Sequence, residues 1–251
     1  MANIQLKFGS LTLGSVNNIT VSGITEKSGK PVQVANIPLS DGGISETARL
    51  KEKTINIEGD IVGTSYDNLR TNIDALHAGL LVLGVQNLTK DDERQIACQL
   101  KDFSHSYDHL TRRAKWTASF VAHFPFWLSV NLTTDQRAPS SGTGYTIANA
   151  GNAPTRLKIT LLCASTNNDL CQFENTTRGE LCKFRGIILP SKNLIVDNRV
   201  TSDDFIVTND GVSDFPHFEG DFINLTPGNN TFEFTGTVPQ SLLLAWYNAW
   251  Y

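Results

Sequence analysis

The stretch Arg113–Leu128, RAKWTASFVAHFPFWL, constrains the fold of this chain more than any other segment. Apolar side chains, including Trp116, Phe120 and Phe124, occupy every second position, and mostly polar side chains lie between them. Successive side chains of a β-strand point to opposite faces, so this period predicts a half-buried strand with those three aromatic residues in its core. Pro125 lacks a backbone donor and is expected to end the strand.

The polar tract that follows, residues 133–144, shows no hydrophobic period. With 251 residues, the chain is long enough for one large domain or two ordinary ones. We therefore predict a first domain over residues 1–132, a linker over residues 133–144 and a second domain over residues 145–251. Both domains are expected to be mainly β, because short alternating segments separated by turn residues recur along the chain.

The first domain is expected to contain one α-helix. Clean alternation in TINIEGDIVG, residues 54–63, predicts a long strand, after which the period changes. The apolar residues of the next segment recur at spacings of three and four: Leu69, Ile73, Leu76 and Leu80. This pattern predicts an amphipathic helix over residues 66–78, with Ser65 as its N-cap and Gly79 as its C-cap.

A long antiparallel hairpin is predicted over residues 95–124, with a polar tip at residues 104–112. The tip contains His105 and His109 beside Asp108. Such a set can hold a metal or act in acid–base catalysis when a third partner is present. The sequence offers no third partner there, so an exposed loop is the favoured interpretation.

The second domain is predicted to be a β-sandwich, because turn residues separate short strands about every ten residues. Its last segment, SLLLAWYNAWY at residues 241–251, is compatible with a final strand or a short helix. Trp246 and Trp250 are candidates for stacking against a sugar, as in galectin-like sandwiches. Packing in a core or an interface is the alternative for both rings.

Motifs of enzymes are missing from the sequence: it contains no GxSxG, HExxH, GxxxxGK[ST] or GxGxxG. We therefore predict no enzyme activity, no catalytic residue and no cofactor. Five carboxylates near the C-terminus suit a solvated sheet edge better than a calcium site, since their spacing is not that of an EF-hand: Asp203, Asp204, Asp214, Glu219 and Asp221.

The four cysteines lack metal-binding spacing, so no metal site is predicted. Buried, reduced thiols are the favoured interpretation. A Cys171–Cys182 or Cys163–Cys171 disulfide, formed after release from a cytoplasm, is the alternative.

Charge and hydropathy exclude further classes of protein. The net charge of −4 provides no general attraction to nucleic acid or to an anionic membrane. No run of 18 apolar residues and no signal-peptide pattern occurs. We therefore expect no membrane insertion, no sequence-specific nucleic-acid binding, and synthesis in a cytoplasm.

The order of these features resembles the distal tail protein family of long non-contractile-tailed (siphovirus-type) bacteriophages. In the first half, the resemblance rests on the long strand at 54–63, the helix YDNLRTNIDAL at 66–76 and the aromatic-Pro-aromatic step in SFVAHFPFWLS at 119–129. The second half contributes three further segments in the same order: GNAPTRLKITL at 151–161, FRGIILPSKNLIVDN at 184–198 and DFINLTPGNNTFEF at 221–234.

The resemblance implies an N-terminal β-sandwich or split barrel with one helix, followed by a galectin-like β-sandwich. It further implies a virion structural protein that forms a hexameric ring, with a back-to-back pair of rings as a variant. The expected partners are the tail tube protein, the tail-tip hub and the tape measure protein. Host-surface carbohydrate binding through the second domain and a tail tube role are the alternatives.

The ring contact is expected on the helix. One small sheet cannot cover an amphipathic helix on all sides, and an exposed apolar face indicates an interface. A repeated contact of this kind around an axis closes a ring. The candidate interface residues are the apolar stripe of the helix: Leu69, Ile73, Leu76 and Leu80.

Overall fold

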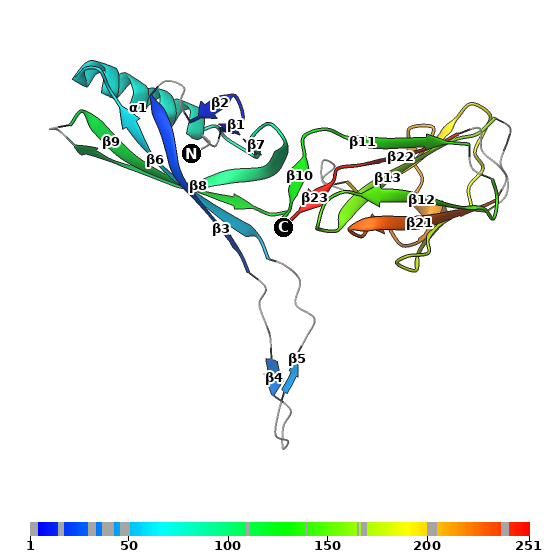
Figure 1. Ribbon diagram of the computed structural model, residues 1–251. Coiled ribbons are helices and arrows are strands. Elements are labelled where there is room, and N and C mark those ends of the chain that lie inside the picture. The colour runs from blue at the N-terminus through cyan, green and yellow to red at the C-terminus, as the bar shows by residue number, and fades with distance from the viewer. Residues whose placement is uncertain are drawn as a thin grey trace. The chain divides into compact units, whose positions relative to one another are not determined.

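The computed structural model describes residues 5–14, 18–29, 34–36, 43–45, 51–108, 111–138, 140–164, 166, 170–199, 205–236 and 241–251 (Figure 1). The chain divides into two compact units, Met1–Val130 and Asn131–Tyr251. The described part is mainly β with a single α-helix, and neighbouring strands in its sheets pair antiparallel, as between β6 (Lys53–Val62) and β9 (Arg113–Ala122) and between β13 (Thr155–Leu162) and β22 (Ser241–Trp246). The predicted fold class, mainly β with one helix and a long hairpin, is therefore confirmed.

One antiparallel sheet organises the first unit, in the order β2-β1-β7-β8-β9-β6-β3. Its strands are β1 (Leu6–Phe8), β2 (Leu11–Leu13), β3 (Ile19–Ser28), β6 (Lys53–Val62), β7 (Gln86–Lys90), β8 (Arg94–Asp108) and β9 (Arg113–Ala122). Strand β10 (Trp127–Ser129) also pairs with β8. Two short strands, β4 (Val34–Asn36) and β5 (Gly43–Ser45), pair with each other.

The central strands β6 and β9 have one apolar and one polar face. On the apolar face, Ile55 and Ile57 lie opposite Phe120 and Ala118 in the register, and Trp116 follows along β9. Trp116 and Phe120 are almost completely buried, as the period of the sequence predicts. The alternation therefore identified the core face of the sheet correctly.

Helix α1 (Tyr66–Leu80) packs on this apolar face and begins as predicted (Figure 1). The Ser65 hydroxyl accepts a hydrogen bond from the Asn68 amide at 3.1 Å, which satisfies one of the free donors of the first turn. The helix ends later than predicted, because it continues through Gly79 and is capped at Leu81. A side chain at position 79 would lie 2.8 Å from the δ-carbons of Leu11, so Gly79 permits close packing on β2.

The apolar stripe of α1 is buried within the first unit itself. Its four residues are at most 2% exposed: Leu69, Ile73, Leu76 and Leu80. A second copy of the chain cannot reach side chains that its own sheet already covers. The prediction that these four residues form a ring interface is therefore wrong. It assumed that one small sheet leaves part of the helix uncovered, whereas the first unit buries the whole apolar stripe.

The β8–β9 hairpin differs from its prediction at both ends. Strand β8 extends to Asp108, so His105 lies within the strand and not on the tip; His109 lies outside the described residues. At the other end β9 stops at Ala122. Phe124 lies in the bend beyond the strand, half-buried, with its ring centroid 5.0 Å from that of Phe126.

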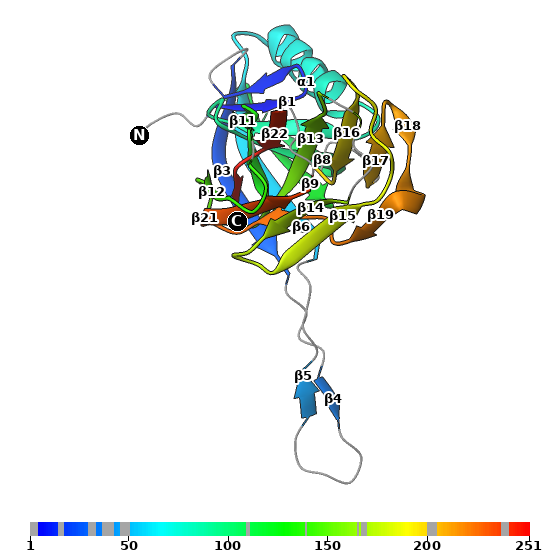
Figure 2. The same cartoon turned by 90° about the vertical axis from the view of Figure 1, so that its right-hand side faces the viewer.

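The second unit is a sandwich of two antiparallel sheets (Figure 2). One has the order β11-β22-β13-β16-β17-β18, with β20 also on β13: β11 (Thr133–Arg137), β13 (Thr155–Leu162), β16 (Asn193–Asp197), β17 (Ile206–Asn209), β18 (Val212–Ser213), β20 (Asn224–Leu225) and β22 (Ser241–Trp246). The other has the order β12-β21-β14-β15-β19: β12 (Gly144–Asn149), β14 (Cys171–Asn175), β15 (Glu180–Phe184), β19 (Phe218–Gly220) and β21 (Gly228–Thr235). A 3-10 turn, η1 (Phe215–His217), precedes β19.

Buried asparagines tie the loops of the sandwich to its sheets. Asn175 and Asn230 are fully buried, and the Asn175 side-chain amide donates to Asn224 O at 2.8 Å and to Asn230 Oδ1 at 3.3 Å. Asn198 accepts from the Leu157 amide at 2.9 Å and donates to Ile223 O at 3.3 Å. Such polar groups are costly to bury unless they are hydrogen-bonded, so these residues fix the loops in one arrangement.

The predicted linker is wrong over its first five residues. Thr133–Arg137 forms β11, which pairs with β22 along its whole length. Polar residues suit this strand because it lies at the edge of its sheet and few of its side chains face the core. The C-terminal segment contains β22 and a short strand, β23 (Ala249–Trp250), which selects the strand among the two alternatives.

Candidate interaction surfaces

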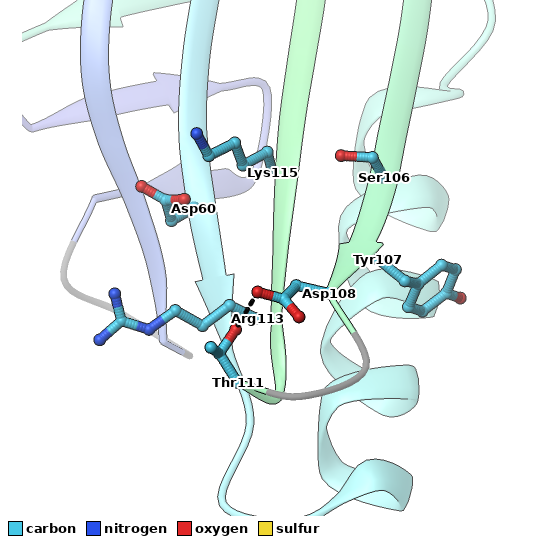
Figure 3. Close-up of a pocket in the computed structure, with 7 residues that line it drawn as sticks. All are labelled: Asp60, Ser106, Tyr107, Asp108, Thr111, Arg113 and Lys115. Atoms are coloured by element: carbon cyan, nitrogen blue, oxygen red, sulfur yellow. Dashed lines mark hydrogen bonds between the residues drawn. The ribbon is translucent and has the colours of Figure 1, made fainter.

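The polar face of the first sheet has a hollow of about 290 Å³ at the hairpin end (Figure 3). Strand pairing places Asp60 of β6 and Ser106 of β8 on either side of Lys115, and Asp108 opposite Arg113. The Asp108 carboxylate accepts a hydrogen bond from the Thr111 hydroxyl at 2.7 Å. Figure 3 shows the Tyr107 ring directed away from Asp60 and Lys115.

This hollow suits contacts with a charged, hydrated surface. Acidic and basic side chains face each other across its strands, with Asp60 opposite Lys115 and Asp108 opposite Arg113. The rest of the same sheet face continues in Ser, Thr, Asn and acidic side chains, with Ser104 hydrogen-bonded to Thr117 at 2.7 Å. A continuous polar sheet face is thus available for contact with water or with a polar partner.

A second surface is the apolar loop between α1 and β7, residues 81–85, called here the 81–85 loop. Its four large apolar residues are exposed, and the Leu83 side chain reaches 93% exposure: Leu81, Val82, Leu83 and Val85. Gly84 in the loop has φ of +88°, which suits glycine. Contiguous exposed apolar residues of this kind mark interaction sites.

The third surface, in the second unit, is an open hollow of about 570 Å³ that we call the phenylalanine hollow. Its lining is Phe205, Ile206, Val207, Thr208, Ser213, Phe215 and Phe222. The Phe205 and Phe222 ring centroids lie 4.5 Å apart, and the Arg156 guanidinium lies 6.0 Å from the Phe205 ring. Burial lowers the pKa of Arg156.

The sugar-stacking candidates predicted from the sequence occupy other places. Trp246 is 3% exposed and belongs to the core of the sandwich, so its ring cannot stack on a sugar. Its indole N–H donates to Asn248 Oδ1 at 3.3 Å. Trp250 lies in β23 and is half-buried. The Trp246 prediction is therefore wrong: the alternating pattern of β22 points this ring inward.

The acidic residues that the sequence singled out in the second unit have protein partners where the structure describes them. No group of three or more His, Cys, Asp or Glu able to hold a metal occurs in the described ranges. Asp214 pairs with His217 at 2.5 Å, and Glu219 pairs with Arg185 at 2.9 Å. Asp221 accepts a hydrogen bond from the Leu181 amide at 3.4 Å. Asp203 and Asp204 lie outside the described residues.

All four cysteines are free and buried in the structure, which agrees with the burial that the favoured interpretation predicts. Burial raises the pKa of the Cys98 and Cys182 thiols to about 12. Thiols in this state are poor nucleophiles, because only the thiolate reacts readily.

The histidine pair His77 and His105 was missed by the sequence analysis. His77 Nε2 lies 3.3 Å from His105 Nδ1, although the two residues belong to different elements. No local pattern could have joined them, since the contact depends on how α1 crosses β8.

No helix in the described part of the chain has the length and apolarity to cross a membrane.

This architecture defines a class: a helix-covered antiparallel sheet followed by a β-sandwich. Among solved structures, the SPP1 Dit (gp 19.1) protein has the same fold, with a TM-score of 0.74, 16% identity, and coverage of 97% of this chain and 98% of that chain. That protein is described as a paradigm of the hub adsorption apparatus in phages that infect Gram-positive bacteria. The resemblance to distal tail proteins is therefore confirmed at the level of the fold.

Two further structures are more distant. A chain of the phage P2 baseplate in its activated conformation with Ca has a TM-score of 0.47, 10% identity and coverage of 97% of both chains. A chain of the tail of an empty GTA particle has a TM-score of 0.27 and 12% identity, with coverage of 48% of this chain and 89% of that chain. No protein-family model and no curated protein matches the sequence.

Proposed function

We propose that this protein is a structural hub of a phage tail tip: a hexameric ring of identical chains between the tail tube and the host-adsorption apparatus. The observation that carries the proposal is the likeness to the SPP1 Dit protein, which extends over 97% of this chain and includes both units. A tail tube role would account for the first unit of this chain but not for the sandwich that follows it. The protein acts without catalysis, as a component of the virion made in the bacterial cytoplasm.

The ring contact is proposed at the sheet edges, in place of the buried helix face. Strand β3 is the last strand of its sheet, and residues 99–106 of β8 pair with β9 on one edge only within the described part of the chain. Open strand edges are templates for pairing with another chain. Alternating strand directions make β3 of one copy antiparallel to β8 of the next, and a repeated heterologous contact closes a ring.

The polar sheet face and the exposed apolar loop then have different roles. Sheets joined edge to edge place their Ser, Thr, Asn and charged side chains around one central channel, where a hydrated surface is required. The 81–85 loop lies at the end of α1, which packs on the opposite sheet face, and supplies an apolar contact for neighbouring tail proteins. The tail tube protein, tail-tip hub and tape measure protein are the proposed partners.

Site-specific cross-linking tests the edge contact. Thr25 of β3 and Ser104 of β8 are exposed, and the native cysteines are buried, so a Thr25→Cys, Ser104→Cys double variant offers two reactive thiols per chain. A short bis-maleimide should give a ladder of covalent species that stops at the hexamer. Mixed single variants should give dimers alone.

The matched control replaces Ser104 by exposed Ser140 of the second unit, as Thr25→Cys with Ser140→Cys, and should give no ladder. If the double variant gives no cross-linked species although the protein is oligomeric, the ring contact does not lie at these two strand edges. Negative-stain images without rings would argue against the hub itself.

Carbohydrate binding through the second unit is a second candidate function, favoured by the phenylalanine hollow. Its aromatic rings and the hydroxyls of Thr208 and Ser213 combine an apolar floor with polar groups, as small-molecule sites do. A glycan array with the intact chain and with Phe215→Ala tests it. Signals that persist unchanged in the variant, or no signal at all, would remove this candidate.

A further inference from the structure

The last turn of α1 and the middle of β8 bring two imidazole rings together. His77 Nε2 and His105 Nδ1 lie 3.3 Å apart, and the ring planes cross at 81° with centroids 5.1 Å apart. Both residues are half-buried. The two atoms belong to chain segments 28 residues apart, so the contact joins the helix to the sheet. We propose that this histidine pair is a binding site for a divalent transition-metal ion such as Zn²⁺.

The distance between the two nitrogens fits chelation. Histidine nitrogens bind Zn²⁺ at about 2.0–2.1 Å, usually in tetrahedral geometry. Two ligand atoms at that distance from a tetrahedral ion lie about 3.3–3.4 Å apart, by the tetrahedral angle. The metal would take the place of the hydrogen between the two ring nitrogens. Little movement of the backbone is then needed for binding.

The surroundings hold the two rings in place. Phe103 meets the His77 ring edge to face, with centroids 4.6 Å apart, and Tyr107 meets the His105 ring at 5.1 Å. These aromatic walls restrict rotation of the imidazoles, which lowers the entropy lost on binding a ligand.

The local charge favours a cation. His77 lies in the last turn of α1, where the free carbonyl groups carry a partial negative charge. Neither ring forms an ion pair with a carboxylate in the described residues. No third His, Cys, Asp or Glu joins the pair in the described residues, so water would complete the coordination of a bound ion. Two imidazole ligands select Zn²⁺, Ni²⁺ or Cu²⁺ over Mg²⁺ and Ca²⁺, which prefer oxygen ligands.

Calorimetric titration of the untagged full chain with ZnCl₂ and NiCl₂ tests the site. The expected result is one ion bound per chain, together with a rise in Tm that EDTA reverses, because a ligand that binds only the folded state stabilises it. His77→Phe and His105→Phe should each abolish both effects, since each leaves a single ligand. MgCl₂ should give neither effect.

Two matched controls keep the outcome specific. His217→Gln, in the second unit, and His123→Gln, exposed after β9, should bind as the unaltered chain does. Circular dichroism confirms that each variant is folded, and the two Phe variants act independently if one fails to fold. No binding to the unaltered chain, or binding that survives both His77→Phe and His105→Phe, would overturn the proposal. Because the readout is metal binding, its failure leaves the proposed hub function unaffected.

Discussion

At the scale of single residues, one carboxylate connects three strands of the first unit. Glu26 Oε2 of β3 accepts a hydrogen bond from Lys53 Nζ of β6 at 3.1 Å and from Trp127 Nε1 of β10 at 2.9 Å. Lys53 is only 2% exposed, so Glu26 is the group that balances its buried charge. The sequence could not reveal this cluster, because Glu26 and Trp127 are 101 residues apart.

We expect Glu26→Ala to lower the free energy of unfolding by about 3–5 kcal/mol, because it leaves a buried lysine without a partner. Asp92→Ala is the matched control: it breaks the exposed Lys7–Asp92 ion pair and should cost at most about 1 kcal/mol. Urea denaturation measures both values. Replacing Lys53 by Met in the Glu26→Ala background should restore most of the loss, and equal costs for the two single variants would refute this account.

A second residue-scale prediction concerns pH. Burial alone would raise the pKa of Asp197, but hydrogen bonds from Arg199 at 2.8–3.3 Å outweigh burial and lower it. A carboxylate whose pKa is lowered by folding stabilises the protein above its unfolded pKa of about 3.9 and loses that contribution as the pH falls through the lower folded value.

The stability difference between the unaltered chain and Asp197→Asn should therefore be constant from pH 5 to 8 and shrink below about pH 4. Denaturation midpoints measured along this pH series provide the test. A difference that does not change with pH would mean that the charge of Asp197 does not contribute.

At the scale of elements, the period of a strand identifies which side chains are buried but not what covers them. The alternation in β9 placed Trp116 and Phe120 in the core, and that is where they lie. The helical period in α1 likewise identified its apolar stripe, but assigned that stripe to a neighbouring copy when the chain's own sheet covers it. Which element covers an apolar face depends on pairings between distant segments, and a local sequence pattern carries no information about them.

Strand β9 provides a direct test of this core assignment. Phe120→Ala should lower the free energy of unfolding by about 3–5 kcal/mol, because it removes a fully buried ring. The centroid of this ring lies 4.9 Å from that of the Phe8 ring. Lys115→Ala, on the exposed face of the same strand, should stay within about 0.5 kcal/mol of the unaltered chain. Thermal or chemical denaturation that reversed this order would contradict the assignment of the two faces.

At the scale of the whole molecule, the boundary between the units determines which fragments fold. The units divide after Val130, and β11 belongs to the sandwich through its pairing with β22. A fragment of residues 131–251 should melt cooperatively and stay in solution. A fragment of residues 145–251 lacks β11, exposes the edge of β22, and should melt lower and aggregate. Equal melting temperatures for the two fragments would show that β11 does not stabilise the sandwich.

The mass of the assembled particle tests the central proposal most directly. Each chain has a mass of 27.6 kDa, so sedimentation equilibrium separates a hexameric ring, or a back-to-back pair of rings, from a monomer without ambiguity. At micromolar concentrations the account predicts a mass equal to that of the hexamer or of two hexamers. A single species of 27.6 kDa at every concentration, with the tail tube protein present as well as absent, would contradict a ring-forming hub.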